Sequence, residues 1–254
     1  HLDLTLPHLG SADLILWPET AIPDFLHQVR AQLTEPLAER ARAAGTEIVI
    51  GIPVLDLATR RYYNGLVSIT SGEDTYAKRH LVPFGEFMPF KDLIGPLAEL
   101  FEVPMSNFSA GEDARPILTV GPYRAGAAIC YEDAFPAEVM QALPEADYLI
   151  TVSNDAWFGD SLAPHQHLEI ARMRALEAGR DLVRATNTGI SALVDHRGRV
   201  LGPIPSFQRG TLGGEITPRA GLTPYARLGN APILALAALL VAAAALIGRR
   251  RRTG

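Results

Sequence analysis

The sequence has 254 residues, of which 48% are hydrophobic, so it is long and apolar enough to bury one sizeable core. Its formal net charge of -5 argues against a general nucleic-acid-binding protein. Its single cysteine excludes intrachain disulfides. The sequence begins at His1, without an initiator methionine or a leader peptide, and we interpret it as the C-terminal portion of a longer protein.

Short apolar runs alternate with helical patterns along most of the chain, which is typical of an α/β fold. The runs that predict strands cover residues 14–17, 47–54, 66–70, 124–130 and 148–153. The patterns that predict helices cover residues 24–44, followed by Gly45, and residues 131–142 and 162–179. Near the end of the sheet, residues 182–195, a turn at 196–198 and residues 200–201 predict paired strands.

Residues 83–110 interrupt this alternation and are rich in proline, glycine and aromatic residues. Four apolar side chains recur in this segment at helical spacing: Leu93, Leu97, Leu100 and Phe101. The segment is either a loop folded back on the core or an apolar arm that dips into a lipid surface. In the second case we expect residues 88–108 to act also as a lid.

An uninterrupted apolar run covers residues 231–247. As a helix it would rise roughly 26 Å, slightly less than the hydrocarbon core of a bilayer. It is either a buried, alanine-rich core helix or a membrane-spanning helix at residues 231–248. Four arginines at 249–252 favour the second interpretation, because they form a strong stop signal. By the positive-inside rule the chain end then lies in the cytoplasm and the globular part lies outside.

Three residues that can carry chemistry lie beside the predicted elements. Cys130 ends an apolar strand and precedes a helical pattern, where backbone N–H groups and the helix dipole would stabilise a thiolate. Glu19 follows another apolar strand, at the carboxyl end where α/β sheets place ligand sites. Lys78 lies in a basic segment. Taken singly, they also fit a structural cysteine, a first-turn glutamate and a solvated lysine.

Together, a carboxylate, an ammonium and a thiol supply the parts that acyl transfer through a thioester requires. Glu19 would remove the thiol proton as general base. The thiolate of Cys130 would attack a carbonyl group, and Lys78 would stabilise the resulting oxyanion. The pattern therefore predicts that these three residues meet in one pocket.

The motifs around them resemble the three signatures of the nitrilase superfamily. They are WPE at 17–19, KRHLVPFGE at 78–86 and CYE at 130–132, in the matching order Glu, Lys, Cys. Within the superfamily, the chain most resembles the apolipoprotein N-acyltransferases, because NDAWF follows at 154–158 and an apolar helix ends the chain. The resemblance covers nearly all of residues 11–250.

The resemblance implies a four-layer α-β-β-α sandwich with Glu19 as base, Lys78 as oxyanion partner and Cys130 as nucleophile. Glu86 would orient Lys78 and hold its charge, although its spacing also fits a surface ion pair. Two residues would line the pocket behind the nucleophile, and two would shape its entrance: Tyr131 with Glu132, and Trp157 with Phe158.

The resemblance also implies an activity. Cys130 would take a fatty acyl group from a membrane phospholipid and pass it to the N-terminal amine of the diacylglyceryl-cysteine of an apolipoprotein, in lipoprotein maturation. The expected partners are the phospholipid, the lipoprotein and the bilayer of the bacterial inner membrane, with the catalytic domain on the periplasmic or outer side. We expect no cofactor and no nucleic acid. The alternatives are a carbon-nitrogen hydrolase, which the membrane tail disfavours, and a tethered scaffold without chemistry.

Two further features bear on the organisation of the chain. His165 and His167 lie two residues apart, on different faces of the predicted helix, so we expect no metal site there. Residues 187–189 are better interpreted as a strand-end turn than as a site.

The expected divisions are a catalytic domain without its first strand at 1–220, a linker at 221–230, a transmembrane helix at 231–248 and a cytoplasmic tail at 249–254.

Overall fold

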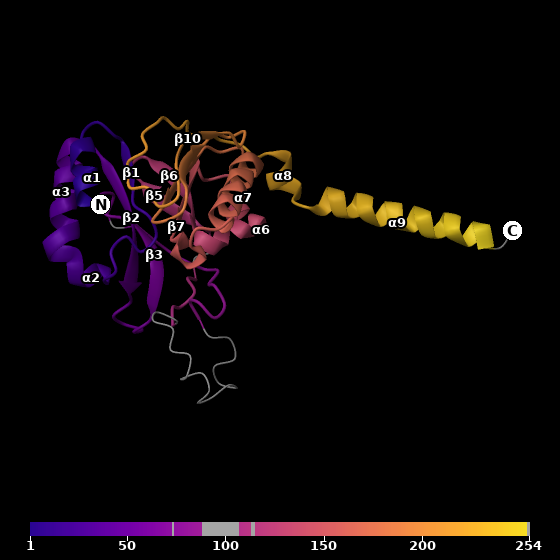
Figure 1. Ribbon diagram of the computed structural model, residues 1–254, viewed down its shortest axis with the longest axis horizontal. Coiled ribbons are helices and arrows are strands. Elements are labelled where there is room, and N and C mark those ends of the chain that lie inside the picture. The colour runs from indigo at the N-terminus through magenta and orange to yellow at the C-terminus, as the bar shows by residue number, and fades with distance from the viewer. Residues whose placement is uncertain (73, 88–106, 113–114, 253–254) are drawn as a thin grey trace, which may run out of the picture.

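The computed structural model describes residues 1–72, 74–87, 107–112 and 115–252. Most of the predicted apolar arm, residues 88–106, lies outside these residues. Two β-sheets form the centre of the fold (Figure 1). One has the strand order β1-β2-β3-β4, and the other has the order β10-β9-β8-β7-β6-β5.

The first sheet comes from the N-terminal third of the chain. Its strands are β1 (Leu14–Leu16), β2 (Glu47–Leu55), β3 (Tyr62–Ser68) and β4 (Asp74–Ala77). β1 runs parallel to β2, and the other pairs are antiparallel. β3 begins earlier than the apolar run at 66–70 predicts, and β4 was not predicted at all. Only Tyr76 is buried in β4, so this strand has no apolar run to reveal it.

The second sheet is parallel at its centre and antiparallel at its edges. Its strands are β5 (Ile117–Val120), β6 (Tyr123–Ile129), β7 (Tyr148–Ser153), β8 (Leu182–Thr186), β9 (Ser191–Val194) and β10 (Val200–Ile204). Every residue of β7 is buried. This burial explains its continuous apolar run, since central parallel strands are covered on both faces.

Helices cover the outer face of each sheet (Figure 1). The first sheet is covered by α2 (Leu26–Val29), the π-helical turn η2 (Arg30–Thr34) and α3 (Glu35–Ala44), with the short α1 (Leu2–Thr5) and η1 (Leu6–His8) nearby. The second is covered by α6 (Pro136–Val139) and α7 (Ala163–Ala178). Three apolar clusters fill the spaces between these layers. The four-layer α-β-β-α sandwich is therefore confirmed.

The predicted helix at 131–142 is wrong in one respect, because it is broken into three pieces. They are the 3-10 helix η3 (Cys130–Ala134), α6 and the 3-10 turn η4 (Met140–Ala142). The break falls at Phe135, which has φ -109° and ψ 85°. Proline disfavours helical geometry in the residue before it, so Pro136 accounts for the break.

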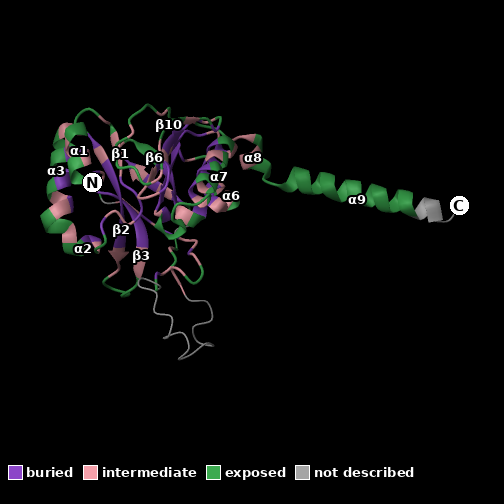
Figure 2. Cartoon of the chain, in the orientation of Figure 1, coloured by how far each residue is buried: buried purple, intermediate pink, exposed green. Residues whose placement is uncertain are grey.

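The C-terminal part leaves the sandwich as helices. After α8 (Pro224–Leu228), α9 (Ala231–Arg252) extends away from the body of the protein. The stretch Ala231–Gly248 is long and apolar enough to cross a membrane, with a mean hydropathy of 2.5, and none of it is buried within the described chain (Figure 2). The interpretation as a buried core helix is therefore wrong for this part of the chain.

Candidate active site

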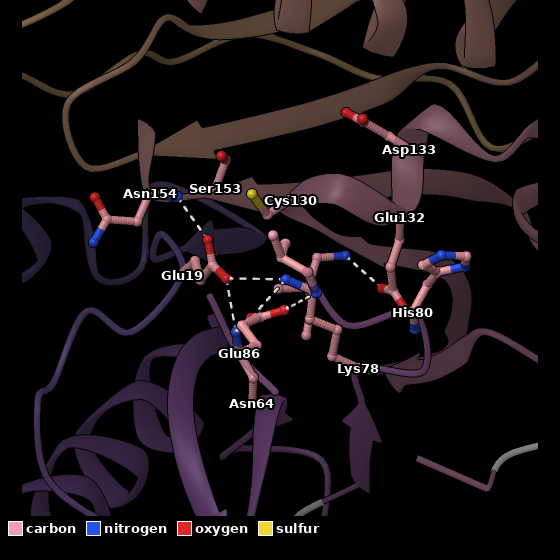
Figure 3. A network of polar contacts seen from close by, with 12 residues as sticks. Glu19, Asn64, Lys78, His80, Glu86, Cys130, Glu132, Asp133, Ser153 and Asn154 are labelled. Carbon is pink, nitrogen blue, oxygen red and sulfur yellow. Dashed lines mark hydrogen bonds and ion pairs between the residues drawn. The ribbon is translucent and has the colours of Figure 1, made fainter. Parts of the chain in front are cut away.

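Three side chains from separate elements converge between the two sheets (Figure 3). Glu19 follows β1, Lys78 follows β4 and Cys130 follows β6. Lys78 Nζ lies 3.6 Å from Glu19 Oε1, and these two residues are 0% and 5% exposed. Both interact electrostatically with the Cys130 thiol, whose sulfur lies beside them in Figure 3. The structure thus brings together the three residues that the sequence motifs single out.

Glu86 lies against Lys78. Its Oε1 is 2.7 Å from Lys78 Nζ, and its Oε2 accepts a hydrogen bond from the backbone N–H of Val82 at 2.8 Å. The side chain of Glu86 is only 14% exposed, so this ion pair is not a surface contact. Glu86 is therefore placed where it can fix the direction of the ammonium group.

Sequence reasoning missed two asparagines that hold Glu19. Asn64 Nδ2 donates to Glu19 Oε1 at 2.7 Å and to Glu86 Oε1 at 3.1 Å. Asn187 Nδ2 donates to the backbone carbonyl of Glu19 at 2.6 Å. The second Glu19 oxygen accepts the backbone N–H of Asn154 at 2.7 Å. A buried asparagine within a strand, as at position 64, was the available signal, because buried amides require partners.

The chain can bring Glu19 this close only because position 51 is a glycine. A Cβ atom at Gly51 would lie 2.2 Å from the carbonyl oxygen of Pro18 and 2.7 Å from the Cα of Glu19. Both distances are shorter than real Cβ contacts allow. The turn after β1 therefore packs directly on the backbone of β2.

Cys130 occupies a tight turn between β6 and η3. Its φ of 53° is in the left-handed region, which costs a non-glycine residue free energy and must be held by its surroundings. Glu132 supplies part of that support, because its Oε2 accepts the backbone N–H of Ile129 at 2.7 Å. Its Oε1 accepts the Tyr76 hydroxyl at 2.8 Å and the backbone N–H of Arg79 at 2.7 Å.

Glu132 is 3% exposed and its carboxylate is occupied by backbone and hydroxyl donors, so it ties the turn at Cys130 to the segment that contains Lys78. Its expected role in lining the pocket behind the nucleophile stays a prediction. Tyr131 is 40% exposed and packs edge-on against Phe135. Trp157 and Phe158, in the 3-10 helix η5 (Asp155–Phe158), are 74% and 50% exposed. Their expected role at the entrance remains a prediction.

The charge states follow from burial and from the neighbouring groups. Burial and the Glu19 carboxylate raise the pKa of the Cys130 thiol to about 12, against the lowering effect of Lys78. Burial alone would lower the pKa of Lys78, but Glu19, Cys130 and Glu86 together raise it above its usual value. These shifts favour a protonated thiol and a charged lysine at neutral pH, so the thiol needs a base, which is the role that the sequence pattern predicts for Glu19.

Among the described residues, one group of three has the side-chain types that bind metals. A sulfur of Cys130, an oxygen of Asp155 and a ring nitrogen of His167 lie within 4.8 Å of one another. However, His167 Nδ1 lies 2.9 Å from Asp155 Oδ1, and Nε2 lies 3.1 Å from Asp133 Oδ2. A ring that faces a carboxylate at both nitrogens donates from both and has no lone pair left for a metal.

The comparison with family models gives the group to which this fold and site belong. Residues 6–225 match the model described as carbon-nitrogen hydrolase. The chain belongs to the carbon-nitrogen hydrolase family. Solved structures share the fold: an amidase, NitN, from Nesterenkonia sp. AN1 has a TM-score of 0.57 at 22% identity, covering 91% of each chain. The C. elegans NitFhit protein has a TM-score of 0.58 at 18% identity, covering 79% of this chain and 52% of that one.

Within the carbon-nitrogen hydrolases, the curated relatives form one group by name. The chain is 44% identical over 252 residues to a protein named apolipoprotein N-acyltransferase from Methylococcus capsulatus, covering 99% of this chain and 49% of that protein. It is 42% identical over 253 residues to a protein of the same name from Azotobacter vinelandii, covering 98% and 49%. The chain therefore spans about half the length of the curated relatives it matches.

Proposed function

We propose that this chain carries the acyl-transfer site of an apolipoprotein N-acyltransferase. The observation that carries the proposal is the convergence of buried Glu19 and Lys78 with the partly buried Cys130, in a chain with 44% identity to a protein of that name. Cys130 takes a fatty acyl group from a phospholipid, which leaves as a lysophospholipid. The acyl group then passes to the N-terminal amine of a diacylglyceryl-cysteine.

In the first step, Glu19 removes the proton of the Cys130 thiol as the sulfur attacks the ester carbonyl. The high pKa of the thiol makes this base necessary. Lys78 stabilises the oxyanion, and collapse of the intermediate breaks the C–O bond. The protonated Glu19 returns the proton to the departing alkoxide, and the acyl group remains as a thioester.

In the second step, the acceptor amine attacks the thioester carbonyl and gives its proton to Glu19. Lys78 again stabilises the oxyanion, and the C–S bond breaks. The sulfur leaves and regains a proton from Glu19, which restores the resting site. One carboxylate therefore serves both half-reactions, as acid and base in turn.

The apolar helix α9 supports a membrane location for this chemistry. A spanning helix followed by four arginines gives a cytoplasmic C-terminus and a catalytic domain on the outer side. Both substrates are lipids anchored in that leaflet. A tethered catalytic domain meets them at a high effective concentration, which suits a transferase better than a hydrolase of soluble amides.

The test is mass spectrometry of the purified protein after incubation with phospholipid vesicles alone. We expect an acyl adduct on the peptide that contains Cys130, absent in Cys130→Ala. A diacylated lipopeptide with a free N-terminal amine should discharge the adduct, and the same lipopeptide with an acetylated amine should not. Rapid loss of the adduct to water would instead identify a hydrolase, and absence of any adduct would contradict the proposal.

A further inference from the structure

A second buried cluster of charges lies next to the Cys130 turn. It contains Asp133 of η3, Asp155 of η5, His167 of α7 and Arg184 of β8. Arg184 Nη1 lies 3.3 Å from Asp133 Oδ2, and Nη2 lies 3.5 Å from Asp155 Oδ2. Figure 3 shows Asp133 on one side of Cys130 and the Glu19 and Lys78 side chains on the other. Because buried ion pairs are often no more stabilising than apolar side chains of the same volume, this cluster indicates a role besides stability.

The surroundings of His167 in this cluster favour its charged form. Asp155 Oδ1 lies 2.9 Å from Nδ1, and Asp133 Oδ2 lies 3.1 Å from Nε2, so each ring nitrogen has a carboxylate oxygen that can accept a hydrogen bond from it. Burial alone would lower the pKa of His167, but the hydrogen bonds to Asp133 and Asp155 raise it to about 9. The charges that face the ring are Asp133 from η3, Asp155 from η5 and Arg184 from β8. A charged ring would thus face two acidic side chains and one guanidinium group.

This imidazolium contacts the nucleophile turn at two levels. At the backbone, His167 Nε2 lies 3.3 Å from the carbonyl oxygen of Cys130, whose left-handed φ needs such support. At the side chain, Ser153 Oγ donates to Asp155 Oδ1 at 2.6 Å, and Ser153 also hydrogen-bonds the Cys130 thiol. Asp155 therefore links the ring to the hydroxyl that neighbours the sulfur.

We propose that His167 is a positioning residue for the nucleophile: a buried imidazolium, clamped between Asp133 and Asp155, that fixes the backbone turn and the thiol direction of Cys130. The inference rests on the proposed function for its rate measurements, but its charge state can be tested without any activity. The positive charge also lies within 4.8 Å of the sulfur, where it favours the thiolate formed during attack. A neutral side chain of similar size cannot supply that charge.

The first test compares His167→Gln with His165→Gln in the full protein. His165 lies on the same helix but is exposed, so its replacement controls for general effects on α7. We expect His167→Gln to slow adduct formation on Cys130 on the order of tenfold to a hundredfold, as a misplaced reacting group does. Iodoacetamide alkylation of Cys130 at a fixed pH should also slow severalfold. His165→Gln should leave both rates unchanged.

The second test is the pH profile, which a purely structural role would not alter. We expect the rate of adduct formation in the wild-type protein to fall as pH rises through about 9, where His167 loses its proton. His167→Gln should lack this fall and remain slow at every pH. Histidine-selective NMR should show a ring that carries two protons at pH 8 in the wild type.

A third variant moves Asp155 without changing any charge. A Cβ atom at Gly189 would lie 1.9 Å from Asp155 Oδ2, so Gly189→Ala must displace that carboxylate. Gly213→Ala is the matched control, because nothing lies within 4 Å of its added Cβ. We expect Gly189→Ala to lower both the pKa of His167 and the rate of adduct formation, and Gly213→Ala to change neither.

The outcomes separate this inference from the proposed function. If the wild type forms no adduct, the proposed function fails, while the alkylation rates and the NMR titration still decide the role of His167. A neutral His167 ring at pH 8 would overturn the inference. Wild-type rates of adduct formation and alkylation in His167→Gln would overturn it as well, and binding of Zn²⁺ at the ring with loss of the two-proton signal would replace it with a metal site.

Discussion

Glu132 accepts the backbone N–H of Arg79 at 2.7 Å and so joins the turn after the nucleophile to the residue that follows Lys78. The same carboxylate holds Ile129, the residue before Cys130. One buried side chain therefore sets the spacing between the nucleophile and the cation.

Replacing this residue by Glu132→Gln keeps its shape but turns one acceptor into a donor. An N–H group then faces the N–H of Ile129 or that of Arg79, and one buried donor loses its partner. We expect a loss of about 1–3 kcal/mol of stability. In detergent, thermal unfolding should show a fall of roughly 2–4 °C per kcal/mol lost. An unchanged midpoint would show that water or a rearrangement satisfies the orphaned group.

Asn64 offers a test of the support for the two carboxylates that face Lys78. Asn64→Ala removes the amide that donates to both Glu19 and Glu86, so the two carboxylates keep only the Lys78 ammonium as a shared partner. We expect adduct formation on Cys130 to slow on the order of tenfold or more, mainly through kcat rather than KM. Single-turnover kinetics with phospholipid vesicles would measure this, and an effect confined to KM would contradict it.

Gly51 tests the close approach of two backbones. In Gly51→Ala the new methyl group must push the turn at Pro18 and Glu19 away from β2. We expect a loss of stability and a loss of acyl transfer together, because Glu19 moves away from the thiol. Gly213→Ala, whose added methyl group meets open space, serves as the control. Full acyl transfer in Gly51→Ala would show that the turn can shift without disturbing the base.

Two charge changes should move the reactivity of the thiol in opposite directions. The Glu19 carboxylate raises the pKa of Cys130, so Glu19→Gln should lower that pKa and speed iodoacetamide alkylation, even though acyl transfer is lost. The Lys78 ammonium lowers the same pKa, so Lys78→Ala should slow alkylation. It should also slow adduct formation by roughly a hundredfold or more, as loss of an oxyanion donor does.

The pH dependence of this labelling follows from the high pKa of the thiol. Well below pH 12 only a small fraction is thiolate, so the alkylation rate of the wild type should rise about tenfold per pH unit between pH 7 and 8. The rise should be less steep as His167 loses its proton near pH 9. A rate that stops rising near pH 9, the ordinary pKa of a thiol, would show an unperturbed thiol. Peptide mapping by mass spectrometry assigns the modification to Cys130.

The sequence predicts the parts of this protein that depend on local pattern. Apolar runs predict the central strands, and the glycines at 45 and 179 end α3 and α7 in left-handed geometry, with φ of 73° and 63°. β4 was missed because only one of its residues is buried. Local periodicity reports burial on one element, so an edge strand with one buried side chain gives almost no signal.

The site was predicted only in part for a similar reason. Motifs identify Glu19, Lys78 and Cys130, but Asn64 and Asn187 contribute through partners 45 and 168 residues away along the chain. The helical spacing of His165 and His167 correctly separates their faces, since His165 is exposed and His167 is turned inward. What His167 meets there depends on η3, η5 and β8, which no local pattern brings together.

The nucleophile comes from the six-stranded sheet, whereas the base and the ammonium come from the four-stranded one. The apolar layer between them, which includes Val49, Leu66 and Ile150, therefore sets the alignment of the reacting atoms. A slip of one sheet over the other would part sulfur from carboxylate while leaving each sheet intact. If the proposed function holds, turnover accordingly depends on the packing of buried apolar residues that lie outside the group of reacting side chains.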